Sequence, residues 1–136
     1  ACGGLRMIGY VTVGTNDLER AKAFYDALFA TISGKRVFDS PQGVVWSLSR
    51  ISPGFGVFIP HDGKPATTCN GSMVALAMLS KKHVDDFYAK AIMLGGTDEG
   101  QRDHNARFYI NYFRDLDGNK LGAYYMEERR TKRRQN

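Results

Sequence analysis

The sequence contains the same strand-and-helix unit twice, 63 residues apart. The segment that begins Tyr10-Val-Thr-Val-Gly leads to Phe24-Tyr25, and the segment that begins Met73-Val-Ala-Leu-Ala leads to Phe87-Tyr88. In each copy the aromatic pair begins fourteen positions after the first residue of the segment. Internal repetition constrains a fold more tightly than composition does, because each copy has to form the same supersecondary unit. We therefore expect functional residues at equivalent places in the two copies.

Length, cysteine content and charge are those of one ordinary cytoplasmic domain. The chain has 136 residues and two cysteines, which suits a reduced protein better than a disulfide-rich secreted one. No apolar run approaches the length of a membrane span, so we expect no membrane partner.

The formal net charge is +5, but five basic and two acidic residues stand in the segment 127–136 alone. We expect this segment to be a disordered basic tail, and we do not expect nucleic acid as a partner, because no aromatic residue is interleaved for base stacking.

Residue spacings predict the order βαβββ for a first module, residues 7–60. Residues 7–14 alternate as in a strand, and Asn16 with Glu19 three positions later predicts a helix with Asn16 as its N-cap. Three short strands follow, because turn-forming Pro and Gly separate them: residues 35–39, 44–49 and 55–60. Residues 61–71 are polar and rich in turn formers, which predicts a linker.

The same order is expected in a second module, residues 72–126. Residues 72–79 form its first strand, Ser80 is the predicted N-cap of a helix, and Gly95-Gly96 ends that helix. The rest is a short strand near Thr97, a loop at 100–106, and strands at 107–114 and 120–126. The two aspartates of the segment 115–119 could suggest a cation loop, but their spacing is not that of a calcium site and favours a tight hairpin turn.

Two of these segments resemble the vicinal-oxygen-chelate superfamily, which includes glyoxalase I, extradiol dioxygenases, and fosfomycin- and bleomycin-resistance proteins. The resemblance is carried by residues 16–25 (NDLERAKAFY) and by residues 114–121 (RDLDGNKL), and it covers residues 7–126. It implies an α+β fold in which two βαβββ modules form curved sheets around a central cavity, as a single domain. It also implies a homodimer.

The resemblance places four cavity-facing positions where metal-dependent members hold a divalent cation with His, Gln or Glu. Here they fall at Tyr10, Phe58, Met73 and Gly122. A neutral phenol and a thioether are poor ligands for such ions, and phenylalanine and glycine have no side-chain donor. We therefore expect no metal and no other cofactor. Reactions that need an open coordination position on the ion are not expected either.

Strand alternation predicts which other side chains face the cavity, because residues two apart share a face of a sheet. By the geometry of the superfamily Tyr112 also faces the ligand, which brings Ile110 and Phe108 to the same side. Trp46 either lines the cavity or packs beneath a helix. The expected ligand-cavity residues are Tyr10, Thr12, Trp46, Phe58, Met73, Ala75, Phe108, Ile110, Tyr112, Gly122 and Tyr124. Such a lining suits a flat or apolar small molecule, unless the aromatic rings fill the cavity themselves.

Three functions remain open at this stage. The first is a metal-free protein that binds a small apolar or aromatic molecule. The second is a lyase, isomerase or dioxygenase-like enzyme that relies on a still unidentified metal or on Tyr10, Tyr112 or His104 as proton donors. His104 follows Asp103, and a histidine beside a carboxylate can act as a general base at neutral pH. The third is an interaction module that uses the basic tail.

Overall fold

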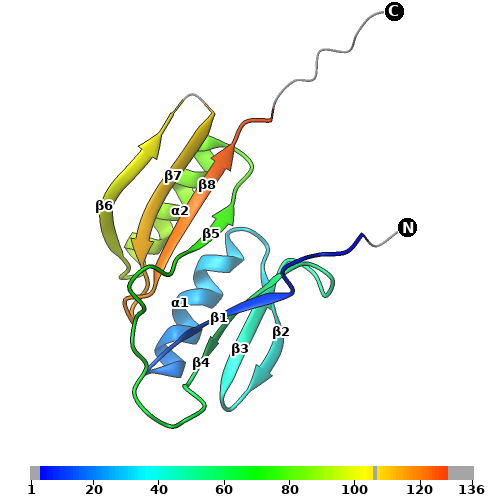
Figure 1. The fold of residues 1–136 in the computed structure, drawn as a ribbon, viewed down its shortest axis with the longest axis vertical. Helices are drawn as coiled ribbons and strands as arrows, with labels where there is room; N and C mark the ends of the chain where they lie inside the picture. The colour runs from blue at the N-terminus through cyan, green and yellow to red at the C-terminus, as the bar shows by residue number, and fades with distance from the viewer. Residues whose placement is uncertain (1–3, 106, 129–136) are drawn as a thin grey trace, which may run out of the picture.

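The computed structural model describes residues 4–105 and 107–128, apart from the side chains of residues 101–104. The first module consists of β1 (Tyr10–Gly14), α1 (Leu18–Ala30), β2 (Lys35–Ser40), β3 (Gly43–Ser47) and β4 (Gly54–Phe58). The second consists of β5 (Val74–Ala77), α2 (Lys81–Met93), β6 (Thr97–His104), β7 (Phe108–Arg114) and β8 (Lys120–Met126). Figure 1 shows the two units one above the other. The predicted α+β fold of two βαβββ modules is confirmed, while residues 129–136 of the expected tail lie outside the described residues.

Each module forms a four-stranded sheet, and the two sheets have the same strand order. The orders are β1-β4-β3-β2 in sheet A and β5-β8-β7-β6 in sheet B, with the first pair parallel and the others antiparallel. Thr12 pairs with Gly56 in sheet A, and Ala75, which lies 63 residues after Thr12, pairs with Gly122 in sheet B. Gly56 is therefore the structural equivalent of Gly122.

This register corrects the expected equivalence of Phe58 and Gly122. Gly14 pairs with Phe58 and Ala77 pairs with Tyr124, so the counterpart of Phe58 is Tyr124. Matching the two modules at their glycines fails because Gly54 is the first residue of β4, whereas Gly118 lies in the turn before β8 with a φ of 89°. A glycine needed for a positive φ in a turn cannot be told in sequence from a glycine within a strand, although the two play different structural roles.

The predicted N-cap residue is confirmed for the helix of the second module and is wrong for the helix of the first. Ser80 caps α2 as predicted, since its hydroxyl accepts a hydrogen bond from the backbone N–H of His83 at 3.0 Å. The N-cap of α1 is Asp17, whose carboxylate accepts from the backbone N–H of Arg20 at 3.1 Å. The predicted cap Asn16 is wrong, because its side chain instead pairs with both backbone groups of Ala66 in the linker. Within the described residues no helix is long and apolar enough to cross a membrane.

One helix packs on one face of each sheet and forms the core there. Phe24, Tyr25 and Leu28 of α1 are buried on sheet A, and Val84 and Phe87 of α2 are buried on sheet B. Burying one such side chain stabilises the fold by roughly 1.5–3 kcal/mol. We call the opposite face of each sheet its open face, because no helix of the described chain covers it.

The loop predicted at residues 100–106 is wrong over its first part, because β6 extends to His104. Arg102 pairs with Asn111 and His104 with Tyr109, after a shift in register that follows Asp98. The segment reads as a loop because it is polar throughout. An edge strand needs no apolar alternation, and polar or charged edges discourage pairing with other chains.

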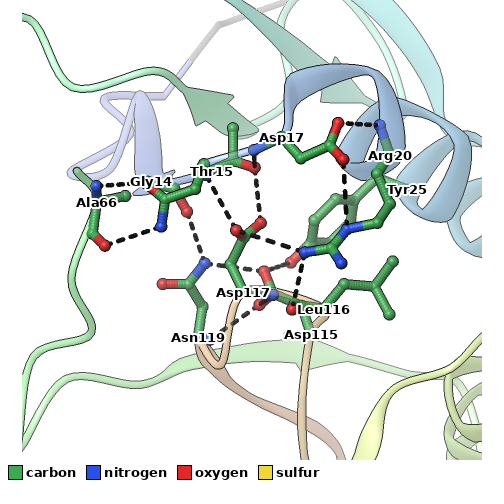
Figure 2. A network of polar contacts seen from close by, with 11 residues as sticks. Gly14, Thr15, Asp17, Arg20, Tyr25, Ala66, Asp115, Leu116, Asp117 and Asn119 are labelled. Carbon is green, nitrogen blue, oxygen red and sulfur yellow. Dashed lines mark hydrogen bonds and ion pairs between the residues drawn. The ribbon is translucent and has the colours of Figure 1, made fainter. Parts of the chain in front are cut away.

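A polar network joins the two modules at the turn between β7 and β8 (Figure 2). The Asp115 carboxylate accepts four hydrogen bonds, from the backbone N–H groups of Asp117 and Asn119, the Asn119 amide and the Tyr25 hydroxyl. Asp117 accepts from the Thr15 hydroxyl at 2.6 Å and from the backbone N–H of Asn16 at 3.0 Å. The Asn119 amide also donates to the Gly14 carbonyl. This segment is the predicted hairpin turn, and its carboxylates are occupied by donors of the chain itself.

Candidate ligand-binding site

The open face of sheet A carries the side chains that alternate with its core residues. Val44, Trp46, Phe55 and Val57 are buried against α1. Their neighbours along the same strands therefore point the other way, since alternate residues face opposite sides of a sheet. On β1 and β4 these are Tyr10, Thr12, Gly54, Gly56 and Phe58. Tyr10 is 68% exposed, so its ring is available to a bound molecule.

With the corrected register, the four positions at which the resemblance places metal ligands are Tyr10 and Gly56 in sheet A, Gly122 in sheet B, and Met73 directly before β5. A Cβ atom at Gly56 would lie 2.9 Å from the Phe58 ring, and one at Gly122 would lie 2.9 Å from Ile110 Cδ1. The space above each glycine is thus already filled by an apolar group.

The residues present do not fit a divalent cation of the superfamily type. Two of the four positions have no side chain, and the other two offer a phenol and a thioether. Elsewhere, among the residues that the structure describes, no group of three or more His, Cys, Asp and Glu side chains could hold a metal ion.

A hollow of about 470 Å³ lies on the open face of sheet A, and we call it the first hollow. Its aromatic lining comes from three strands, with Tyr10 on β1, Phe38 on β2 and Phe58 on β4. Val37 and Val45 add apolar surface. The remaining lining residues are small or polar: Gly9, Gly54, Ser47, Ser49, Arg50 and Ser52.

Two local features of the sequence shape the floor of the first hollow. The pairing of β2 with β3 shifts between Arg36 and Phe38, which is a β-bulge, and both Val37 and Phe38 line the hollow. Gly43 lets the Phe58 ring approach β3 closely, because a Cβ atom there would come within 2.4 Å of that ring. The Phe38 and Phe58 rings are stacked, with centroids 6.4 Å apart and planes 21° apart.

A second hollow, of about 630 Å³, is lined by residues of both modules. Met73, Ala75 and Tyr124 border it from the second module, and Val11 and Phe29 are among the residues that border it from the first. The predicted cavity residues are therefore divided. Tyr10 and Phe58 belong to the first hollow, whereas Met73, Ala75 and Tyr124 belong to the second.

Trp46 lies on the helix side of sheet A, away from Tyr10. It is 2% exposed, its ring centroid is 5.5 Å from that of Tyr25, and its indole N–H donates to Asp26 at 2.8 Å. Of the two expected placements, packing beneath a helix is the one that the structure shows. The indole contributes to the second hollow from this side.

The remaining predicted residues are spread over sheet B. Phe108 packs on Tyr124 with ring centroids 5.8 Å apart, and Lys120 Nζ lies 4.9 Å from the Tyr112 ring centroid. Ile110 covers Gly122 and is buried. Tyr10 and Tyr112, two of the three expected proton donors, lie on different sheets, and the side chain of the third, His104, lies outside the described residues.

Among the residues that the structure describes, Arg50 is the one charged residue that lines the first hollow. In the part of the chain that the structure describes, its guanidinium forms no ion pair or hydrogen bond. Sequence reasoning missed Arg50 and also Phe38. Phe38 could have been found from its place in a predicted strand, but the loop position of Arg50 gave no periodic signal.

Two polar pairs outside the first hollow shift the pKa values of their members. Hydrogen bonds from Arg36 lower the pKa of Asp26, against a smaller opposing effect of burial. Burial and the neighbouring Asp115 carboxylate raise the pKa of Tyr25 well above its usual value. Both pairs lie on the helix side of sheet A or at the module junction, where they stabilise the fold. Neither pair lines the first hollow, which Arg50 does.

Known structures share this fold. A glyoxalase/bleomycin resistance protein from Albidiferax ferrireducens T118 is 37% identical to this chain, with a TM-score of 0.80, over 88% of this chain and 98% of its own. The chain belongs to the glyoxalase/bleomycin resistance family. No protein-family model and no curated protein sequence matches it.

More distant members of the glyoxalase fold show the same architecture. A glyoxalase/bleomycin resistance protein/dioxygenase family enzyme from Burkholderia phytofirmans PsJN is 17% identical, with a TM-score of 0.68, over 87% of this chain and 97% of its own. A lactoylglutathione lyase from Agrobacterium tumefaciens is 20% identical, with a TM-score of 0.67, over 90% of this chain and 95% of its own. These two likenesses concern the fold alone.

Proposed function

We propose that this family member binds a small apolar or aromatic molecule on the open face of sheet A, without a metal ion. One observation carries the proposal. The positions that would hold the metal are Tyr10, Gly56, Met73 and Gly122, and the space over both glycines is filled by Phe58 and Ile110. A chelated ion is thereby replaced by an apolar surface.

The first hollow has the size and lining that such a molecule requires. Pockets for small ligands usually measure about 300–1,000 Å³ and combine apolar walls with few polar groups, and this hollow measures about 470 Å³. Tyr10 and Phe38 are more than half exposed, so their rings gain from being covered. A flat molecule would stack on them and gain about 0.5–1.5 kcal/mol for each well-placed ring pair.

We also propose that the protein acts as a homodimer. Tyr10 and Phe38 in the first module, and Met73 and Met126 in the second, are large apolar residues left exposed in the single chain. A second copy would cover part of this surface and close the hollows from outside. Light scattering after size exclusion would show twice the mass of one chain, and a monomer at micromolar concentration would remove this part of the proposal.

Binding is tested with 2-naphthalenemethanol, an uncharged aromatic probe, by calorimetry and thermal shift. We expect saturable binding that raises the melting temperature, since a ligand of the folded state stabilises it. Phe38→Ala should weaken binding, because it removes one exposed ring of the hollow. Leu79→Ala is the matched control, because Leu79 is 85% exposed and lies outside the first hollow.

The metal-free part of the proposal has its own test. Titration of the wild type with Zn²⁺, Ni²⁺, Co²⁺ and Mn²⁺ should detect no stoichiometric binding that depends on Tyr10 or Met73. The variants Tyr10→Phe and Met73→Leu should therefore respond to these ions as the wild type does. One tightly bound ion per chain that is lost in both variants would overturn it.

An equal response of Phe38→Ala and Leu79→Ala to the aromatic probe would show that the first hollow is not the binding site.

A further inference from the structure

We propose that the first hollow selects planar aromatic carboxylates, with the ring on Tyr10, Phe38 and Phe58 and the carboxylate paired with Arg50. This inference rests on the proposed function and adds the chemical class of the ligand. It arises from the combination of an aromatic floor and a single cation within one hollow of about 470 Å³. No acidic residue of the described chain lines that hollow.

The Arg50 guanidinium is available to a ligand. It forms no ion pair or hydrogen bond with any other residue that the structure describes, whereas Arg36 and Arg114 are each held by a carboxylate at 2.6–2.8 Å. A guanidinium presents donors in a planar fork that matches a carboxylate in two parallel hydrogen bonds. Arg50 therefore offers the geometry that a ligand carboxylate needs.

The loop that carries Arg50 is held in place by serine side chains. The Ser49 hydroxyl accepts from the backbone N–H groups of Ile51 and Ser52 at 3.3 and 3.1 Å, and the Ser47 hydroxyl donates to the Ser52 and Pro53 carbonyls. These bonds on both sides of Arg50 fix the backbone at the rim of the hollow. Less conformational freedom is then lost when the ligand binds.

The floor beside Arg50 is suited to a flat ring. Glycines lie where apolar side chains come close to the backbone of the sheet: a Cβ atom at Gly54 would be 2.7 Å from Val45, and one at Gly43 would be within 2.4 Å of the Phe58 ring. The stacked Phe38 and Phe58 rings provide apolar contact but no hydrogen-bond acceptor for a cation. The stacked rings and the positive charge of Arg50 together favour an aromatic anion over an aliphatic anion or a cation.

The test compares 2-naphthoate with 2-naphthalenemethanol, which has the same ring system and no charge, by calorimetry on the full chain at low and high salt. We expect 2-naphthoate to bind about tenfold more tightly, as one charge-assisted hydrogen-bonded pair predicts. Arg50→Gln should remove this preference, and Arg50→Lys should keep part of it. Arg107→Gln is the control with the same loss of charge. Arg107 is exposed, directly precedes β7 in the second module and does not line the first hollow.

The outcomes separate this inference from the proposed function. If both probes bind wild type equally, or if Arg50→Gln and Arg107→Gln weaken 2-naphthoate to the same extent, the assignment of Arg50 is overturned while a small-molecule site remains. If neither probe binds at millimolar concentration, the proposed function falls as well. Circular dichroism of the variants checks that they fold.

Discussion

The Tyr25 hydroxyl donates a hydrogen bond of 2.6 Å to the Asp115 carboxylate, and so joins the helix of the first module to a turn of the second across 90 residues of sequence. Both residues are buried, and burial together with Asp115 raises the pKa of Tyr25. The phenol therefore stays protonated and remains a donor at neutral pH. The junction between the modules therefore includes a buried polar pair beside its apolar contacts.

Tyr25→Phe should destabilise the protein by about 1.5–3 kcal/mol, the usual range for a hydrogen bond to a charged group. The buried carboxylate would keep three of its four donors and lose the one from the other module. Urea denaturation measures the change in the free energy of unfolding. Tyr10→Phe is the control, because the Tyr10 hydroxyl forms no hydrogen bond with the residues described, and an equal loss in both variants would contradict the assigned role.

Asp26→Asn should reduce stability at neutral pH and have progressively less effect in acid. Arg36 lowers the pKa of Asp26 from its ordinary value of 3.8 in the folded state. A lowered folded pKa means that the carboxylate stabilises the fold above 3.8 and that this contribution is lost as the pH falls through the lower folded value. The difference in urea midpoint between wild type and Asp26→Asn should therefore begin to shrink only as the pH falls below 3.8.

The control for this pH series is Glu127→Gln, an exposed carboxyl that forms no ion pair within the described chain. Its midpoint should follow that of wild type at every pH. A gap between wild type and Asp26→Asn that stays constant down to about pH 3 would show that the Arg36 pair does not set the acid response.

Gly43→Ala should destabilise the protein more than Gly122→Ala. At Gly43 a Cβ atom would lie 2.3 Å from the Phe58 ring and 2.6 Å from the Val57 carbonyl oxygen, and the backbone cannot yield easily. At Gly122 it would lie 2.9 Å from the terminal methyl of Ile110, which can rotate away. Overpacking costs about 1–3 kcal/mol, so we expect that loss at Gly43 and a smaller one at Gly122. Equal melting temperatures of the two variants would contradict the close packing of the Phe58 ring on β3.

Trp46 should be shielded from acrylamide in the folded protein. It is the single tryptophan of the chain and is 2% exposed beneath α1. The fluorescence quenching constant should be several-fold smaller in buffer than in concentrated urea, where the indole meets solvent. Similar constants in both conditions would place Trp46 at an accessible surface instead.

The repeat and its periodicities were sufficient to predict the fold because they record local geometry. Ser80 was found as a cap since its hydroxyl bonds three residues ahead, within the segment that the pattern describes. Asn16 was misread because its partner Ala66 lies 50 residues away. The polar end of β6 was misread because an edge strand needs no apolar face.

Less of the candidate site could be predicted than of the fold. Alternation placed Tyr10 and Phe58 on one face, as the strand register shows, but it could not show that Met73 and Tyr124 border a different hollow. That division depends on how two sheets are oriented, which no local pattern records. The position of Arg50 depends on serine bonds within an irregular loop, and for that reason also escaped the sequence.

The loops that follow β3 and β7 occupy equivalent places in the duplicated unit but have taken up separate tasks. In the second module the loop is committed to the junction, where Asp115, Asp117 and Asn119 bond to the first module. In the first module the serine-held loop leaves the Arg50 side chain unpaired within the described chain. We therefore expect Arg50 to tolerate substitution without loss of stability, whereas Asp115, Asp117 and Asn119 should not, because they bond the two modules together. The loop after β7 stabilises the contact between the modules. The loop after β3 is free of that role and can change in sequence as a ligand-binding loop would.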